Sequence, residues 1–246
     1  MNAVETKNLT KKYGDKTAVD AIGFSVAEGE LFALLGVNGA GKTTTIRMLC
    51  CLSKPDSGEA LVYGKNTAAD PNGVKRLVGI STQDTAVAPN LTVRENLEFA
   101  AGIYGLPKER IKEKVAEIVA AFHLEEVEKS RAKTLSGGWQ RKVSIAMALI
   151  SAPRVLFLDE PTLGLDVLAR RELWRVIGEL KGKITIVLTT HYMEEAEALS
   201  DRIGIMAGGR LIACGTLAEL EQSSGEAGLE NAFIKIVEKS GIKGGE

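Results

Sequence analysis

Gly36-Val-Asn-Gly-Ala-Gly-Lys-Thr43 fits the pattern G-x-x-x-x-G-K-[ST], and it says more about the architecture than any other part of the sequence. It directly follows the apolar run Leu31-Phe-Ala-Leu-Leu35, and a helical pattern begins at Lys42. The glycines let backbone N–H groups turn inward around phosphate oxygens, and the N-terminus of the helix adds positive potential. The sequence therefore predicts a phosphate-binding loop between a buried strand and a helix.

Two side chains of this loop suit a nucleotide and its metal ion. Lys42 would bring a positive charge to the β- and γ-phosphates, and the hydroxyl of Thr43 suits Mg²⁺. The alternative is a glycine-rich turn before a helix with no role in phosphate binding. The pattern G-x-x-x-x-G-K-[ST] arises by chance in roughly 1% of chains of this length. The nucleotide-binding residues predicted for this loop are Gly36, Val37, Asn38, Gly39, Ala40, Gly41, Lys42, Thr43 and Thr44.

A second predicted site lies in Arg154-Val-Leu-Phe-Leu-Asp-Glu-Pro161, an apolar strand that ends in two carboxylates. Asp159, at the carboxyl end of this strand, can hold Mg²⁺ directly or through water. Glu160 could then orient or deprotonate an attacking water molecule. The alternative is that the two acids only end the strand before Pro161.

Further aliphatic runs predict the fold class. Val155-Leu-Phe-Leu158 and Ile184-Thr-Ile-Val-Leu188 do not alternate with polar residues, which is typical of strands buried on both faces. Helical patterns occupy 42–52, 93–104, 109–122, 140–150, 167–180 and 193–199. Strands that alternate with helices predict an α/β fold, a P-loop core with a mainly parallel sheet.

Two regions depart from this alternation. Residues 4–30 alternate weakly and contain turn signals, which predicts an antiparallel β flank, and residues 93–150 are mainly helical. We therefore expect a single domain at 1–240. Its parts are a catalytic core with the β flank at 1–92 and 151–215, an inserted helical subdomain at 93–150, C-terminal helices at 216–240 and a tail at 241–246.

The composition gives no sign of a nucleic-acid-binding, disulfide-rich or membrane-spanning protein. The 31 basic and 32 acidic residues leave a net charge of −1, so there is no electrostatic indication of a nucleic-acid partner. The three cysteines match neither a disulfide framework nor a metal site, which favours a reducing, cytoplasmic setting. No apolar run approaches the ~20 residues that span a bilayer.

Thr134-Leu-Ser-Gly-Gly-Trp-Gln-Arg141 places Ser-Gly-Gly at the start of a helix, where a hydroxyl and free N–H groups can hold an anion. A second phosphate cradle far from the P-loop suggests two copies arranged head to tail, each γ-phosphate lying between two chains. With these motifs in this order, the chain resembles the nucleotide-binding subunits of ATP-binding-cassette (ABC) transporters over about 4–240. The resemblance implies ATP and Mg²⁺ as ligands and ATP hydrolysis as the activity.

The resemblance also implies roles for residues outside the P-loop. Tyr13 sits where these proteins stack an aromatic ring on adenine, and Val19 would pack beside it. Gln83 matches the glutamine that reaches Mg²⁺ and the attacking water, and His191 matches the switch histidine that contacts the γ-phosphate. Taken alone, Tyr13 would more often be a packed surface aromatic and Gln83 a solvated side chain.

Other matched residues would complete the site of a second chain. Ser136, Gly137 and Gly138 match the signature motif that binds nucleotide in trans, and Asp166 matches the loop that crosses the dimer interface. The position after the two glycines, usually Gln in this family, is Trp139 here. Tryptophan cannot accept a hydrogen bond, so a contact made by that glutamine is not expected in this chain.

Other stretches are similar to the ABC-2 type of exporter, notably Asn90-Leu-Thr-Val-Arg-Glu-Asn-Leu-Glu-Phe99 and Thr190-His-Tyr-Met-Glu-Glu-Ala-Glu197. They imply an ATPase that pairs with a second copy of itself on MgATP and drives export through integral membrane permease subunits. Such a subunit would be peripheral, on the cytoplasmic face of the cell membrane. The alternatives are an ABC importer ATPase and a soluble ABC-type ATPase, although the coiled coils of repair ATPases are absent.

The segment Asp84-Thr-Ala-Val-Ala-Pro-Asn-Leu91 is the expected contact with the membrane partner. It is largely uncharged, and Pro89 and Asn90 predict a loop before a helix capped by Thr92. Loops are usually polar, so its apolar side chains need cover. They either pack on their own helical subdomain or, as in the family's coupling groove, receive a short helix from the membrane subunit.

Overall fold

The computed structural model describes residues 1–242, so 243–246 of the expected tail lie outside the described residues. The chain begins with an antiparallel sheet in the order β2-β1-β4-β5. Its strands are β1 (Asn2–Tyr13), β2 (Lys16–Ala27), β4 (Ser57–Val62) and β5 (Lys65–Asn66). The turn between β1 and β2 contains Gly14 at φ +56°, a value that glycine adopts without strain. This sheet confirms the β flank expected from 4–30.

A six-stranded sheet forms the centre of the molecule, in the order β10-β9-β3-β8-β7-β6. Its strands are β3 (Leu31–Leu35), β6 (Val78–Ser81), β7 (Val155–Asp159), β8 (Thr185–Thr190), β9 (Arg202–Ala207) and β10 (Arg210–Gly215). All neighbouring pairs are parallel except β9 and β10. Every residue of β3, β7 and β8 is buried, which explains why these runs do not alternate. The expected mainly parallel sheet is therefore confirmed.

Successive residues of β3 point into two different cores. Leu31, Ala33 and Leu35 belong to a cluster shared with the helical subdomain, whereas Phe32 and Leu34 belong to a cluster shared with the antiparallel sheet. This alternation follows from the two-residue period of a strand. The central sheet is thus covered on both faces.

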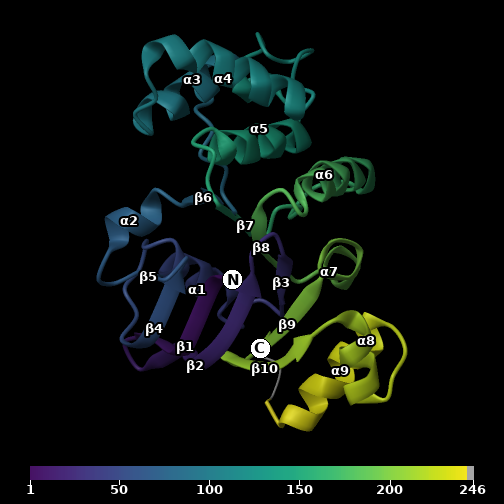
Figure 1. Cartoon of the computed structure of the whole chain (residues 1–246). Helices are drawn as coiled ribbons and strands as arrows, with labels where there is room; N and C mark the ends of the chain where they lie inside the picture. Colours follow the sequence, from purple (N-terminus) through teal and green to yellow (C-terminus); the bar gives the residue numbers. More distant parts are fainter. Residues whose placement is uncertain (243–246) are drawn as a thin grey trace.

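Helices fill the rest of the fold (Figure 1). Helices α3, α4 and α5 form a block at one end of the molecule, and α8 and α9 lie at the other end beside β9 and β10. Thr92 starts α3, and Thr216 starts α8, each through a capping box. The helices are α1 (Lys42–Leu49), α2 (Pro71–Lys75), α3 (Val93–Ile103), α4 (Lys108–Ala121), α5 (Gly137–Leu149), α6 (Val167–Leu180), α7 (Met193–Leu199), α8 (Leu217–Ser224) and α9 (Leu229–Ser240), with a 3₁₀ turn at Ala132–Thr134.

Some helix boundaries differ from those expected from the sequence. Helix α5 begins at Gly137, three residues before the expected start, because both glycines of the signature take helical positions. Helix α1 ends at Leu49 and not at residue 52, because Cys51 adopts a left-handed conformation with φ +57°. Helix α6 agrees at both ends, since Asp166 caps its first turn.

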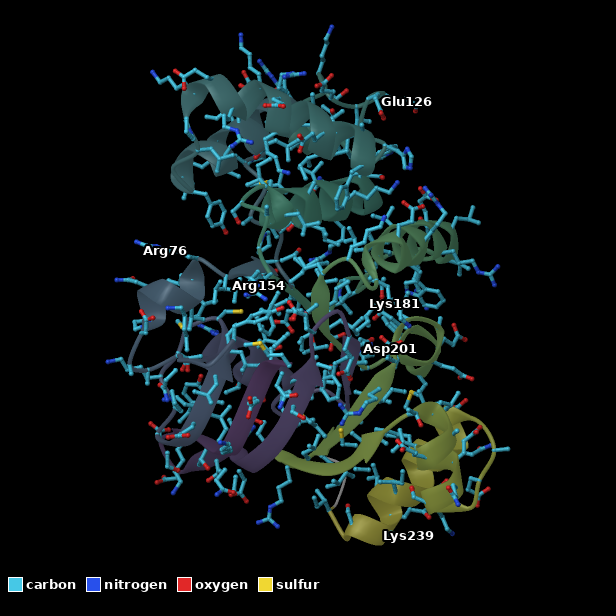
Figure 2. The ribbon with its side chains drawn as sticks, viewed as in Figure 1. Arg76, Glu126, Arg154, Lys181, Asp201 and Lys239 are labelled. Atoms are coloured by element: carbon cyan, nitrogen blue, oxygen red, sulfur yellow. The ribbon has the colours of Figure 1, made fainter. Side chains whose placement is uncertain are left out.

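Charged side chains project from the surface of both ends of the molecule (Figure 2). Two exposed ion pairs join segments that are far apart in the sequence: Lys181 with Asp201 at 2.8 Å and Arg154 with Glu28 at 2.7 Å. Exposed pairs of this kind contribute little to stability, so the two cores hold the fold together. Across residues 1–242, none of the helices has the length and apolar character required to cross a membrane.

Candidate active site

The order of the central strands brings the predicted site residues to one edge of the sheet. Strands β3, β8, β7 and β6 are consecutive neighbours and run parallel, so their carboxyl ends meet. The P-loop follows β3, His191 follows β8, Asp159 and Glu160 end β7, and Gln83 follows β6. Ligands of open parallel sheets bind at this kind of edge.

Two glycines of the P-loop are required by close backbone contacts. A Cβ atom on Gly36 would lie 2.4 Å from the carbonyl oxygen of Met206, and one on Gly41 would lie 2.5 Å from that of Ala18. Gly41 also has φ +103°, in the region that favours glycine. The loop is therefore held in a curved form by β2 and β9 on either side.

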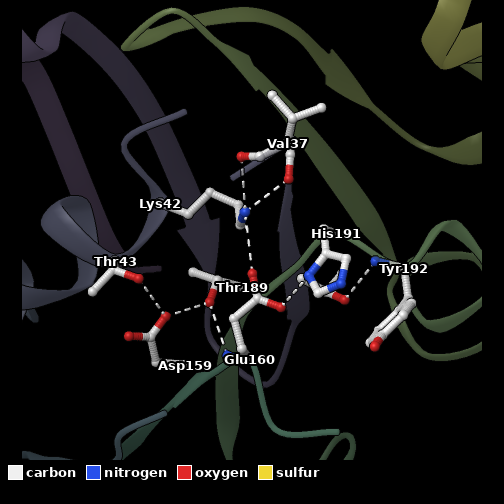
Figure 3. A network of polar contacts seen from close by, with 10 residues as sticks. Val37, Lys42, Thr43, Asp159, Glu160, Thr189, His191 and Tyr192 are labelled. Atoms are coloured by element: carbon white, nitrogen blue, oxygen red, sulfur yellow. Dashed lines mark hydrogen bonds and ion pairs between the residues drawn. The ribbon is translucent and has the colours of Figure 1, made fainter. Parts of the chain in front are cut away.

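Lys42 is buried at the base of this loop and is fully engaged (Figure 3). Its Nζ atom donates to the carbonyl oxygens of Gly36 at 2.7 Å and Val37 at 3.2 Å, and it lies 3.1 Å from Glu160 Oε1. The carboxylate thus neutralises the lysine that was predicted to face phosphates. Any anion entering the loop would compete with Glu160 for this charge.

Asp159 and Thr43 form a compact group of oxygen atoms. The Thr43 hydroxyl donates to Asp159 Oδ1 at 3.0 Å, and the hydroxyl of Thr189 donates to the same oxygen at 2.6 Å. Thr189 Oγ1 also accepts from the backbone N–H of Glu160 at 3.0 Å. Sequence reasoning missed Thr189, because the predicted strand stopped at Leu188; the available signal was a hydroxyl two residues before His191.

Glu160 joins Lys42 to His191, the residue predicted to contact the γ-phosphate. Its Oε2 atom lies 2.7 Å from His191 Nδ1, and its side chain is buried. Its backbone has φ +49°, which costs a residue other than glycine about 1–3 kcal/mol. Hydrogen bonds from the backbone N–H of Glu160 to Thr189 stabilise this conformation. In it, the carboxylate points toward Lys42 and His191.

A cavity of about 460 Å³ lies over this network. Of the residues predicted to bind nucleotide or to catalyse, it brings together Tyr13, Asn38, Gly39, Gly41, Lys42, Thr43, Thr44, Gln83 and Glu160. Tyr13 is half exposed at its rim. Val19 does not reach the cavity: it is fully buried, where it would lie 3.4 Å from a Cβ on Gly41, and its neighbour Ala18 lines the cavity instead.

Arg141, from α5 in the helical block, holds the segment that carries Gln83. Its guanidinium donates to the backbone carbonyl oxygens of Thr82 at 2.7 Å and Gln83 at 2.6 Å. Burial lowers the pKa of Arg141 from its ordinary value, and the nearby Asp159 opposes this. Arg141 was not among the predicted site residues, although it lies only three residues after Gly138.

The signature motif lines a different cavity, of about 600 Å³. Ser136 and Gly138 lie there with Trp139 and Leu168, and the P-loop does not contribute. Ser136 is the N-cap residue of α5, but its hydroxyl makes no capping bond. One chain therefore carries the P-loop and the signature on separate surfaces, and Gly137 occupies the first position of α5 beside them.

Three further residues near the signature have defined partners. Asp166 Oδ1 accepts from the N–H groups of Leu168 and Ala169, both at 2.9 Å, and so caps α6. The Nζ atom of Lys142 lies 4.7 Å from the centre of the Trp139 ring. Gln140, which follows this tryptophan, donates to backbone carbonyls of the preceding loop.

The comparisons with known proteins agree with this geometry. A family model described as ABC transporter matches residues 19–163. The chain is 41% identical over 240 residues to the probable multidrug ABC transporter ATP-binding protein YbhF of Escherichia coli (strain K12), covering 95% of this chain and 41% of that protein. It is also 41% identical over 224 residues to the daunorubicin/doxorubicin resistance ATP-binding protein DrrA of Streptomyces peucetius, covering 91% and 68%. The chain thus spans less than half the length of the E. coli relative.

Solved structures are similar over most of the chain. The structure of an ATP-binding subunit of an ABC transporter has a TM-score of 0.84 and 32% identity, covering 96% of this chain and 99% of that one. A dimeric ATP-binding cassette in a post-hydrolysis state, bound to ADP and Pi, has a TM-score of 0.77 and 28% identity, covering 87% and 98%. The chain therefore belongs to the ABC transporter family.

Proposed function

We propose that this chain binds MgATP, pairs head to tail with a second copy of itself, and drives export through separate permease subunits in the membrane. One observation carries the proposal: the P-loop and the signature lie on separate cavities of the same chain. A γ-phosphate in the P-loop can be reached by a signature only if that signature comes from another chain. Two copies related by a twofold axis would complete two sites.

The residues at the P-loop fit a nucleotide with Mg²⁺. Thr43 and Asp159 supply hard oxygen donors that already lie 3.0 Å apart, and Gln83 shares a second cavity with both. Within residues 1–242 no cluster of three or more His, Cys, Asp or Glu could hold a metal alone. Mg²⁺ is usually held by one or two carboxylates together with phosphates, which suits this donor set. When bound, it would neutralise charge on the phosphates.

The chemistry that we assign to this chain's own residues is hydrolysis by positioning and electrostatics. Lys42 moves from Glu160 to the phosphates, which frees the carboxylate to orient or deprotonate water. His191, already 2.7 Å from Glu160, keeps that carboxylate in place and faces the γ-phosphate. Tyr13, at the rim of the cavity, stacks on the adenine.

Lys42→Ala is expected to weaken MgATP binding by about 10- to 100-fold, because a charge-assisted hydrogen bond to phosphate contributes about 1.5–3 kcal/mol. Isothermal titration calorimetry measures the change. Lys65→Ala is the matched control, since Lys65 is half exposed and pairs only with Asp70 in the described structure. Equal affinity in the Lys42 variant and the unaltered chain would remove this lysine from the phosphate site.

Ser136→Arg is expected to prevent dimerisation while leaving ATP binding in the P-loop unchanged. A long cation at the N-cap of α5 would fill the cavity that has to receive the phosphate of the second chain. Light scattering in the Glu160→Gln background measures this: ATP should double the mass of the parent and not that of the double variant. A parent whose mass does not respond to ATP would refute the head-to-tail pairing.

The direction of transport rests on the relatives, which are named for drug resistance and multidrug transport. We infer an exporter subunit that is held at the cytoplasmic face of the cell membrane by its permease. An importer ATPase and a soluble ABC-type ATPase are the competing functions. Co-purification with an integral membrane partner, followed by efflux assays with that pair, separates the three.

A further inference from the structure

Glu195, in helix α7, is a buried carboxyl group that the proposed hydrolysis does not use. Its side chain has no exposed surface. Oε1 accepts from the indole N–H of Trp174 at 3.0 Å, whereas Oε2 is buried without a hydrogen-bond partner among the described residues. The hydroxyl of Thr162 is also buried and unpartnered there. Unsatisfied buried polar atoms are rare, and they often mark functional positions.

The carboxyl group lies where three segments of the active site meet. Thr162 is two residues after Glu160, and Thr190 directly precedes His191; both hydroxyls lie close enough to affect the pKa of Glu195. Trp174 belongs to α6, the helix that begins after Asp166. One side chain thus bonds to helix α6 and lies near both the segment after Glu160 and the segment that carries His191.

A second contact runs between the same helix and the same switch segment. The guanidinium of Arg170, in α6, lies 4.4 Å from the ring centre of Tyr192, and the Tyr192 ring lies 4.1 Å from that of His191. The backbone N–H of Tyr192 donates to the hydroxyl of Thr190 at 3.0 Å. The position of His191 therefore depends on how its segment is held against α6 and α7.

Glu195 has the environment of a neutral acid. Burial raises its pKa and the charge of Glu160 adds to this, whereas the nearby polar groups of Thr190, Thr162 and Trp174 lower it. Arg141 is near enough to sense Glu195, but its Nη atoms donate to the carbonyls of the Gln83 segment. A buried carboxylate without an ion-pair partner is costly, so the protonated form is favoured.

We propose that Glu195 is a positioning residue for ATP hydrolysis, because it joins helix α6 and the segment after Glu160 to the segment that carries His191. The proposal rests on the proposed ATPase function. Its proton gives the buried oxygen a donor for the threonine hydroxyls, and an amide can supply the same donor. For this role the shape and the hydrogen bonds of the Glu195 carboxyl group are needed, and a negative charge on it is not.

The test compares Glu195→Leu with Glu195→Gln. The leucine variant should lower kcat for ATP hydrolysis by about 10- to 100-fold, the effect of a small misplacement of reacting groups, and change ATP affinity less than about twofold. The glutamine variant should retain most of the turnover. Because Oε2 is unsatisfied, an apolar side chain of similar volume need not unfold the chain, and a thermal melt checks this.

NMR of the histidine side chains tests whether Glu195 affects His191, because a purely structural role of Glu195 would leave the imidazole resonances of His191 unchanged. The chain has two histidines, His123 and His191, and His123 is exposed in the helical block. The leucine variant should shift the imidazole resonances of His191 and leave those of His123 unchanged. Glu194→Leu, at an exposed neighbouring position of α7, is the matched control and should change neither turnover nor spectra.

Failure of the proposed ATPase function and failure of the role proposed for Glu195 give different results. If the unaltered chain hydrolyses no ATP, the proposed function is wrong. If it does, but a folded Glu195→Leu variant keeps its kcat and its His191 resonances, Glu195 does not position the switch histidine. Loss of turnover in the glutamine variant as well, with normal folding, would show that the carboxyl charge is needed and would overturn the neutral-acid role.

Discussion

Glu160→Gln should lower kcat for ATP hydrolysis by on the order of 10²–10⁴-fold, the range expected when a positioned general base is lost. The amide has the same shape but cannot accept a proton from water. It also loses the charge that pairs with Lys42 at 3.1 Å, so the lysine is freer to meet phosphate. ATP affinity should therefore be kept or increased, and the nucleotide-bound dimer should accumulate.

Single-turnover kinetics and light scattering measure the two parts of this result. Glu30→Gln is the matched control, because Glu30 is also buried and paired, with Arg202 at 3.2 Å, but it precedes β3 at the opposite end from the P-loop. That variant should turn over ATP like the unaltered chain. Near-normal hydrolysis by the Glu160 variant would mean that another group activates the water.

The sequence was sufficient for the features that depend on local patterns. The uninterrupted apolar runs predicted β3, β7 and β8, because strands covered on both faces have no polar alternation. Caps fixed several helices: Thr92 and Asp166 start α3 and α6 where the sequence indicated. The strand order follows from neither pattern, yet it is the order that brings the P-loop, Glu160 and His191 together.

The residues missed are those whose meaning comes from long-range contacts. Thr189, Arg141 and Glu195 are ordinary residues in the sequence, and only the pairing of β7 with β8 and the packing of α5, α6 and α7 gives them partners. Val19 illustrates a different limit. Adjacent residues of a strand face opposite sides, so Ala18 lines the cavity while Val19 lies in the core, and the sequence alone does not show which of the two faces the nucleotide site.

The segment 84–91, where we expect the membrane partner, has a defined place in the structure. Asn96 of α3 donates to the carbonyl of Ala88 and accepts from its N–H at 2.8 Å, so the loop is fixed to the helical block. Val87 is half-buried against the core of that block. On α3, the helix that contains Asn96, the apolar side chains of Phe99 and Ile103 are 56% and 69% exposed, so they lie outside the core. Val87 is thus only partly covered by its own subdomain, and the helix that follows the loop carries exposed apolar side chains.

A cavity of about 420 Å³ lies beside the active site and reaches Asp84, the first residue of this segment. Its lining includes Thr43 and Asp159 of the site, Gln83 and the half-exposed Leu52. Arg141 holds the backbone of Gln83 from α5. A displacement of the Gln83 backbone would therefore reach the helical block directly, through its hydrogen bond with Arg141.

Val87→Asp should abolish transport, or assembly with the permease, while ATP binding by the isolated subunit stays near normal. A charge placed at this apolar position would have to be desolvated when a membrane subunit covers it, which costs several kcal/mol without a partner charge. Calorimetry with ATP, co-purification with the permease and an efflux assay measure the three properties separately. Ile234→Asp is the matched control, because Ile234 is a 49% exposed apolar residue on α9, at the other end of the molecule. If the Val87 variant still co-purifies and still exports, the membrane subunit docks elsewhere, and the apolar surface of α3 needs another explanation.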